Sequence, residues 1–191
     1  MAEYYFINQK IMTLDNNISI GTIDSDNSLD PIHLLRGEKL LPEPSYINIT
    51  LADTSGDFYP DIVSSPITLY SSTIKNCLDN CAIDSIHYYP VNISDPESGK
   101  TSHDYWLANI CNRINCLDIN NSDTEVDVFG TGLDFKSFCI DESRTAGAEI
   151  FRLDECARLV IINERIYSEL SKADLKGIIM KNTRDYDGHG M

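Results

Sequence analysis

Three carboxylates at alternating positions have the clearest chemical potential in this chain of 191 residues. Asp123, Glu125 and Asp127 alternate with Thr124 and Val126, so an extended strand would place all three on one face. Like charges on one face repel one another, and cations, a metal ion or a basic protein partner would stabilise them, although exposure to water also suffices. We predict that these three carboxylates bind a basic partner.

A second, sparser group of carboxylates follows in a segment rich in turn residues. Asp53, Asp57 and Asp61 recur at every fourth position around Gly56 and Pro60. We include Asp53 and Asp57 among the candidate partner-binding residues. The alternative that such acidic residues only keep the protein soluble stays open.

Motifs for catalysis and for phosphate binding are missing from the sequence. Gly130–Gly132 follows a strand-like segment, but a phosphate-binding turn needs a third glycine and a following helix, so we interpret it as a tight turn. No G-x-S-x-G nucleophile motif occurs. No motif connects the four histidines, which are His33, His87, His103 and His189. We therefore predict no catalytic residue and no cofactor.

Two segments have some features of metal sites. Asp24–Asp30 has oxygen-bearing side chains like a calcium loop, but Leu29 stands where the turn needs glycine and Leu35 where the loop needs a bidentate glutamate. Cys111 and Cys116 are five residues apart, which does not fit the spacing of a structural zinc site. We predict no metal site.

The net charge of −15 restricts the class of partner. The acidic excess lies within residues 1–160, because residues 161–191 contain five acidic and five basic residues. A field of this sign repels nucleic acid and anionic membranes, and it attracts a basic protein. Composition is that of an ordinary globular protein, with 42% hydrophobic and 24% charged residues.

The hydrophobic pattern predicts an α+β fold with a mixed, mainly antiparallel sheet and a few helices. We expect one compact domain over residues 1–191, with a loop at 15–30 and a flexible tail at 185–191. Strands are expected at these segments: Tyr4–Ile7, Ile47–Leu51, Tyr105–Ile110, Ile114–Leu117, Val126–Phe129 and Leu133–Ile140.

Two segments share one strand-helix-strand order. In the first, a strand at Ile67–Tyr70 precedes a helix at Ser71–Ala82 and a strand at Ile86–Val91. The second consists of a strand at Leu159–Ile162, a helix at Asn163–Ala173 and a strand at Ile178–Met180. Aligned at an offset of 92 residues, the apolar positions of both units coincide. Any two such units would share part of this pattern, so a true equivalence is a hypothesis.

The N-terminal segment and the cysteines favour a cytoplasmic location. Met1–Phe6 lacks the positive region of a secretory signal, and no apolar run approaches the roughly 20 residues that span a bilayer. Six cysteines are spread thinly along the chain, so we expect unpaired thiols that are mostly buried, with Cys77 and Cys81 packed in a core.

The order of several short motifs resembles one bacterial family. Ser65–Tyr70 reads SPITLY, Ile83–Val91 reads IDSIHYYPV, and Glu149–Glu155 reads EIFRLDE. Between them, Tyr105–Asp123 reads YWLANICNRINCLDINNSD. This order is similar to that of immunity protein family eleven of polymorphic toxin systems, over about Ile47–Lys181.

The resemblance implies a cytoplasmic antidote, not an enzyme, that protects its producer by binding a toxin. Such toxins are often nucleases, whose basic surface would attract an acidic inhibitor. Within an LD-x-x-x-S pattern, Asp118 and Ser122 serve either the family's function or only local structure. A regulatory or scaffold module stays an alternative, as does an enzyme that uses Asp118, Asp123 and Glu125. The oligomeric state stays open.

Overall fold

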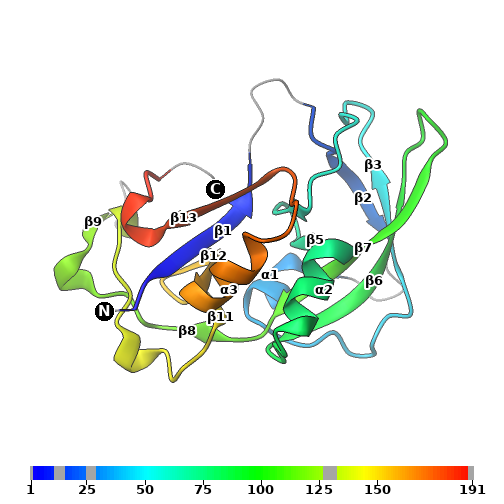
Figure 1. The fold of residues 1–191 in the computed structure, drawn as a ribbon. Helices are drawn as coiled ribbons and strands as arrows, with labels where there is room; N and C mark the ends of the chain where they lie inside the picture. Colours follow the sequence, from blue (N-terminus) through cyan, green and yellow to red (C-terminus); the bar gives the residue numbers. More distant parts are fainter. Residues whose placement is uncertain (1, 11–15, 25–28, 127–132, 189–191) are drawn as a thin grey trace.

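The computed structural model describes residues 2–10, 16–24, 29–126 and 133–188 (Figure 1). These residues form two large sheets, a separate two-stranded sheet and three α-helices. Most strand pairs are antiparallel. The fold is therefore α+β with a mixed, mainly antiparallel arrangement, as predicted.

The larger sheet has six strands in the order β2-β3-β6-β7-β5-β4. At its centre, β6 (Ile86–Ser94) and β7 (Thr101–Ile110) form a long antiparallel hairpin. β3 pairs with β6 in the parallel direction, and the other pairs are antiparallel. The remaining strands are β2 (Ile20–Asp24), β3 (Ile47–Leu51), β4 (Ile62–Val63) and β5 (Leu69–Ser71).

The second of the two large sheets has five strands in the order β13-β1-β12-β11-β8. Its strands are β1 (Tyr4–Gln9), β8 (Arg113–Ile114), β11 (Ile150–Leu153), β12 (Cys156–Asn163) and β13 (Ile178–Asn182). β9 (Asp123–Val126) and β10 (Leu133–Ser137) form the two-stranded sheet. The short 3-10 helices are η1 (Ile119–Asn121), η2 (Glu142–Arg144) and η3 (Thr183–Asp185).

Both predicted strand-helix-strand units are present, and they share one topology. β5 and β6 flank α2 (Ser72–Asn80), and each pairs antiparallel with β7, which lies between them. β12 and β13 flank α3 (Glu164–Leu170), and each pairs antiparallel with β1, which again lies between them. The two outer strands of each unit are therefore parallel.

Each helix begins at a side-chain cap, as the sequence predicts. The Ser71 hydroxyl accepts from the backbone N of Ile74 (3.4 Å). The side-chain oxygen of Asn163, Oδ1, accepts in the same way from the backbone N of Ile166 (3.0 Å). These caps satisfy N–H groups that the first helical turn leaves without a partner.

The two helices lie next to each other and cover one shared hydrophobic core (Figure 1). Residues of α2 and α3 pack there against both large sheets, because each helix turns an i, i+4 pair inward. This central cluster contains Ile74, Leu78, Ile166 and Leu170 from the helices and Ile7, Ile62, Tyr70, Ile86, Ala108, Ile110, Ile150, Val160 and Ile162 from strands. A further cluster covers the opposite face of each sheet.

Two peripheral segments contain ordered structure within the described residues. The expected loop at 15–30 contains strand β2, which pairs with β3 although its sequence is polar, because Ile18, Ile20 and Ile23 pack into the cluster behind that sheet. Of the expected tail at 185–191, residues 189–191 lie outside the described residues, and the described part contains Tyr186, which is buried against Phe6 and Phe138. Burial of this aromatic ring stabilises the described part of the segment.

The six cysteines all lie within the described residues and form no disulfide there, as predicted, but only two of them are buried. Cys81 and Cys116 lie inside, whereas the other four cysteines are half-buried. Burial raises the pKa of Cys116 to about 12, and burial also raises the pKa of Cys77 and of Cys111. No helix among the described residues is long and apolar enough to cross a membrane.

The shared core predicts that both halves of the protein unfold together. We expect Leu78→Ala and Leu170→Ala each to lower the free energy of unfolding by about 2–5 kcal/mol, because each leaves a cavity in the central cluster. The control Leu41→Ala, at a side chain that is 83% exposed, should change it by less than about 0.5 kcal/mol. Urea unfolding followed by fluorescence and by circular dichroism checks this. Two separate transitions in either core variant would contradict the single domain that we expect.

Candidate partner-binding cleft

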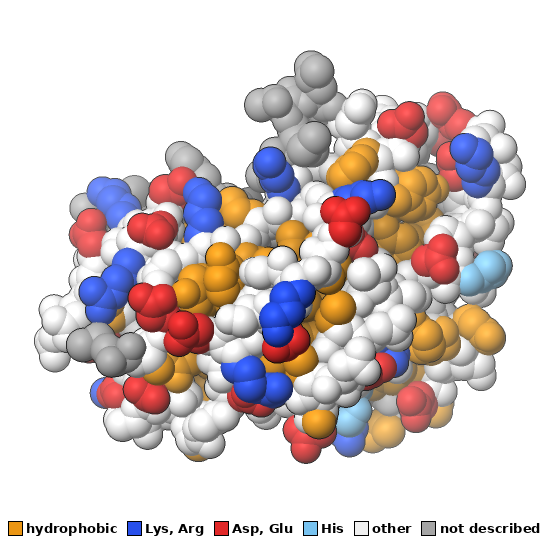
Figure 2. All heavy atoms as spheres, viewed as in Figure 1, with side chains coloured by type: hydrophobic (Ala, Val, Ile, Leu, Met, Phe, Trp, Pro, Cys, Tyr) orange, Lys and Arg blue, Asp and Glu red, His pale blue; other side chains and the backbone are white. Residues whose placement is uncertain are grey.

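A cleft of about 720 Å³ opens beside β7, and we call it the β7 cleft. Figure 2 shows hydrophobic side chains in a hollow at this end of the molecule, with acidic and basic side chains around them. The cleft joins the N-terminus of α2, the strand β7 and the connection between α3 and β13. Its lining consists of Tyr59, Asp61, Ser71, Ser72, Thr73, Lys100, Thr101, Ser102, His103, Asp104, Tyr105, Asp174 and Lys176.

Two tyrosines line the cleft, of which Tyr59 is half-buried and Tyr105 is buried. The ring centroids of Tyr59 and Tyr105 are 6.4 Å apart, and the planes are tilted by 42°. The Tyr105 hydroxyl donates to the carbonyl of Pro60 (2.6 Å), and this bond fixes the ring. Tyr105 is only 4% exposed. Tyrosine combines a large apolar area with a polar end, and it is enriched where proteins bind one another.

Burial and nearby carboxylates both raise the pKa values of the two cleft tyrosines. Burial raises the pKa of Tyr105 above its usual range, and the charges of Asp61 and Asp104 raise it further. Burial also raises the pKa of Tyr59, with an added contribution from the charge of Asp95. A phenol in such a field resists losing its proton, because the phenolate would be a further negative charge.

Asp61 joins the two strand-helix-strand units at the base of the cleft. Its side chain accepts from the Ser71 hydroxyl and from the backbone N of Lys176, both at 2.5 Å. Its backbone N donates to the carbonyl of Lys176 (2.8 Å), and its own carbonyl accepts from the backbone N of Ser71 (2.9 Å). Both carboxylate oxygens are therefore used to hold the cap of α2 against the α3–β13 connection.

The rim of the cleft is exposed and carries both signs of charge. Asp104 lies on β7 and Asp174 on the α3–β13 connection, and both side chains are exposed. Lys100 and Lys176 are also exposed at the rim. Within the described parts of the chain, no three His, Cys, Asp or Glu side chains gather in a way that could hold a metal ion. The arrangement suits the binding of a polar surface with aromatic contacts.

The structure does not bring the two predicted acidic groups together. Asp53 and Asp57 are exposed on the segment between β3 and β4 that leads into Tyr59, so they lie near the β7 cleft in the chain. Asp123 is exposed on β9, and Glu125 belongs to the same extended strand. β9 and β3 lie at opposite ends of the molecule (Figure 1). The prediction for Asp127 falls outside the described residues.

Sequence reasoning named Asp61 only within an acidic segment and Ser71 only at the start of a helix, and it did not single out Asp104, Asp174 or Lys176. Asp104 directly precedes Tyr105–Asp123, one of the segments that carry the family resemblance, and this position was the available signal for it. Asp174 and Lys176 gave no signal of their own, because only the fold places them beside β7.

Asp118 and Ser122 serve local structure. The Ser122 hydroxyl donates to the carbonyl of Asp118 (2.6 Å) and accepts from the backbone N of Cys139 (2.9 Å). The Asp118 carboxylate accepts from the side chain of Asn121 (2.7 Å). These bonds satisfy the backbone around η1 and hold the start of β9 against the segment that follows β10.

The fold and the site together define an α+β protein with an open, polar cleft whose rim carries both signs of charge. The model of the immunity protein family Imm11 matches residues 44–185, which include every residue that lines the β7 cleft. The chain therefore belongs to this immunity protein family. No curated protein matches the sequence.

The position of Asp61 predicts a structural effect of its side chain. Asn at this position keeps the shape but offers one acceptor oxygen, so either the Ser71 hydroxyl or the Lys176 N–H loses its partner. We expect Asp61→Asn to lower the free energy of unfolding by about 1–3 kcal/mol. The matched control Asp57→Asn, at an exposed side chain, should cost less than about 0.5 kcal/mol. Equal urea midpoints for the two variants would show that Asp61 does not join the units.

Proposed function

We propose that this chain is a cytoplasmic immunity protein that binds and neutralises a toxin encoded beside its own gene. Membership of the immunity protein family, shown over residues 44–185, is the observation that carries this proposal. We expect inhibition to work by covering a surface of the toxin rather than by a reaction, and the carboxylate of Asp61 and the hydroxyl of Ser71, which meet in the cleft, are both held in structural hydrogen bonds.

The β7 cleft is the surface that we propose for the toxin. Tyr59, which is half-buried beside the buried ring of Tyr105, supplies aromatic area, and aromatic side chains contribute strongly to binding energy between proteins. Carboxylates at its rim and on the neighbouring segment supply the attraction for a basic partner; these are Asp53, Asp57, Asp95, Asp104 and Asp174. A cleft between two units that share a core is also preorganised, so that little order must be gained on binding.

The charge of the whole chain favours a toxin with a basic surface. A nuclease fits this description, because it must attract the phosphates of its substrate. The net charge of −15 would attract such a partner electrostatically. The range of this attraction is set by the Debye length, which is about 10 Å at 0.1 M salt and about 3 Å at 1 M salt. Association should therefore slow as salt increases. The strand face of Asp123 and Glu125 is the second candidate surface, since Asp123 is exposed on β9.

Charge reversal at the rim tests the proposed surface. We expect Asp104→Lys with Asp174→Lys to weaken binding of the purified toxin at least about tenfold, mainly by slowing association. The matched control reverses Glu43 and Glu142, two exposed carboxylates that do not line the cleft, and it changes the net charge by the same amount. Biolayer interferometry at several salt concentrations measures both variants.

The same assay distinguishes the alternatives. Equal effects of the rim pair and the control pair would mean that only the overall charge matters, and the cleft would not be the interface. A larger effect from reversing Asp123, Glu125 and Asp127 would place the interface on the acidic strand. If the unmodified chain neither binds the neighbouring toxin nor protects cells that express it, the proposed function is wrong.

A further inference from the structure

A second pocket, of about 380 Å³, lies where the two large sheets meet α1 (Pro31–Leu35). Ile62, Ile67 and Val160 give it apolar walls, and α1 adds Ile32 and Leu35. Ile32 is 54% exposed, which is high for a large apolar side chain. We call this the arginine pocket, because Arg152 and Arg158 also line it. It shares no lining residue with the β7 cleft.

Arg152 is a buried cation at the wall of this pocket. Arg152 is 2% exposed and lies on β11 in the five-stranded sheet. Nη1 donates to the carbonyl of Ala157 (3.0 Å) and Nη2 donates to the Thr68 hydroxyl (3.1 Å), while Nε has no hydrogen-bond partner. A guanidinium carries five N–H donors, so protein acceptors use less than half of its capacity.

No carboxylate among the described residues compensates the two arginines. Neither Arg152 nor Arg158 forms an ion pair with them, and the pocket has no acidic lining residue. The chain has twice as many acidic as basic residues, 30 against 15, so a purely cationic pocket is contrary to its composition.

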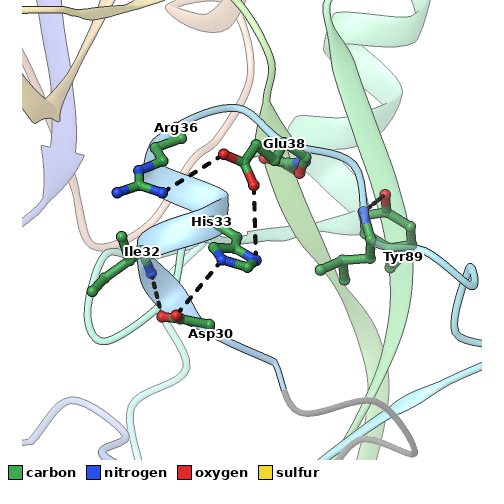
Figure 3. Close-up of polar contacts among 8 residues, drawn as sticks. Asp30, Ile32, His33, Arg36, Glu38 and Tyr89 are labelled. Atoms are coloured by element: carbon green, nitrogen blue, oxygen red, sulfur yellow. Dashed lines mark hydrogen bonds and ion pairs between the residues drawn. The ribbon is translucent and has the colours of Figure 1, made fainter.

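The acidic residues beside α1 are engaged on its other side. Asp30 caps the helix by accepting from the backbone N of Ile32 (2.8 Å), and its carboxylate lies 3.9 Å from His33. Glu38 lies 3.8 Å from His33 and 3.9 Å from Arg36 (Figure 3). Neither Asp30 nor Glu38 lines the arginine pocket.

The burial of an unpaired guanidinium is costly, and the protein cannot relieve it by releasing a proton. Burial lowers the pKa of Arg152, but arginine stays charged in proteins because its ordinary pKa is above about 12. A buried charge without a counterion destabilises the folded state, because the protein interior replaces its hydration poorly. An anion in the pocket would remove that cost and would also use the free N–H donors.

We propose that the arginine pocket binds a small molecule with one carboxylate on an apolar body. A planar carboxylate matches the fork of a guanidinium, and one negative charge balances the one buried cation. The apolar walls would hold the rest of the molecule, and the volume lies within the range of small-molecule sites. Arg158, which is exposed, would attract the anion at the entrance. This site is independent of toxin binding.

Three probes with the same ring test the proposal on the unmodified full chain. Phenylacetate carries a carboxylate, phenyl phosphate carries a phosphate, and 2-phenylethanol is neutral. We expect phenylacetate to bind with a Kd below about 1 mM in calorimetry, and the other two probes to bind at least about tenfold more weakly. The ¹⁵N–¹H signal of Arg152 Nε should shift with phenylacetate alone. Binding of 2-phenylethanol or phenyl phosphate at equal strength, or an unchanged Arg152 signal, would overturn the proposal.

Two variants with a matched control locate the probe. Arg158→Gln should weaken phenylacetate about two- to fivefold, as expected for an exposed charge. The control Arg36→Gln removes an exposed arginine of α1 that does not line the pocket, and it should leave the Kd unchanged. Arg152→Lys keeps the charge but loses the fork, so binding should fall at least about tenfold. If that variant does not fold, the Arg152 signal of the unmodified chain decides. Equal Kd values for the two glutamine variants would contradict the site.

Discussion

The burial of α2 and α3 in one hydrophobic cluster is the constraint on which the rest of the structure depends. Each helix turns its i, i+4 pair, Ile74 with Leu78 and Ile166 with Leu170, into a core that both large sheets share. Burial of such side chains contributes about 1.5–3 kcal/mol each. The strand residues of both large sheets that face this cluster are covered by α2 and α3. The packing of the two helices in the cluster therefore fixes how the two sheets lie relative to each other.

This constraint sets the positions of the β7 cleft and of the arginine pocket. Fixing α2 against the α3–β13 connection brings Asp61 to Lys176, and the β7 cleft opens around that contact. Fixing one sheet against the other buries Arg152 where the sheets meet α1, and the arginine pocket forms there. The β7 cleft is the surface that we propose for a protein partner, whereas the cationic pocket suits a small anion. Both properties follow from how the two units are joined.

The sequence predicts local features of this fold well and distant ones poorly. The helices were predictable, because Ser71 and Asn163 are caps followed by apolar residues at helical spacing. The equivalence of the two units was also visible in the offset of 92 residues. Strand β2 and the burial of Tyr186 were not predictable from the sequence. In both places a few apolar contacts order a segment that is otherwise polar. The cleft was not visible either, because its central bond joins residues 115 positions apart.

Hydrogen–deuterium exchange of the chain, alone and with its toxin, tests most directly the claim that the β7 cleft is the binding surface. Backbone amides exchange slowly where a partner excludes water or suppresses local opening. Our account predicts that the toxin slows exchange at residues 59–61, 100–105 and 171–176 and leaves residues 123–126 unchanged. Slower exchange at residues 123–126 with no change along the cleft would contradict it.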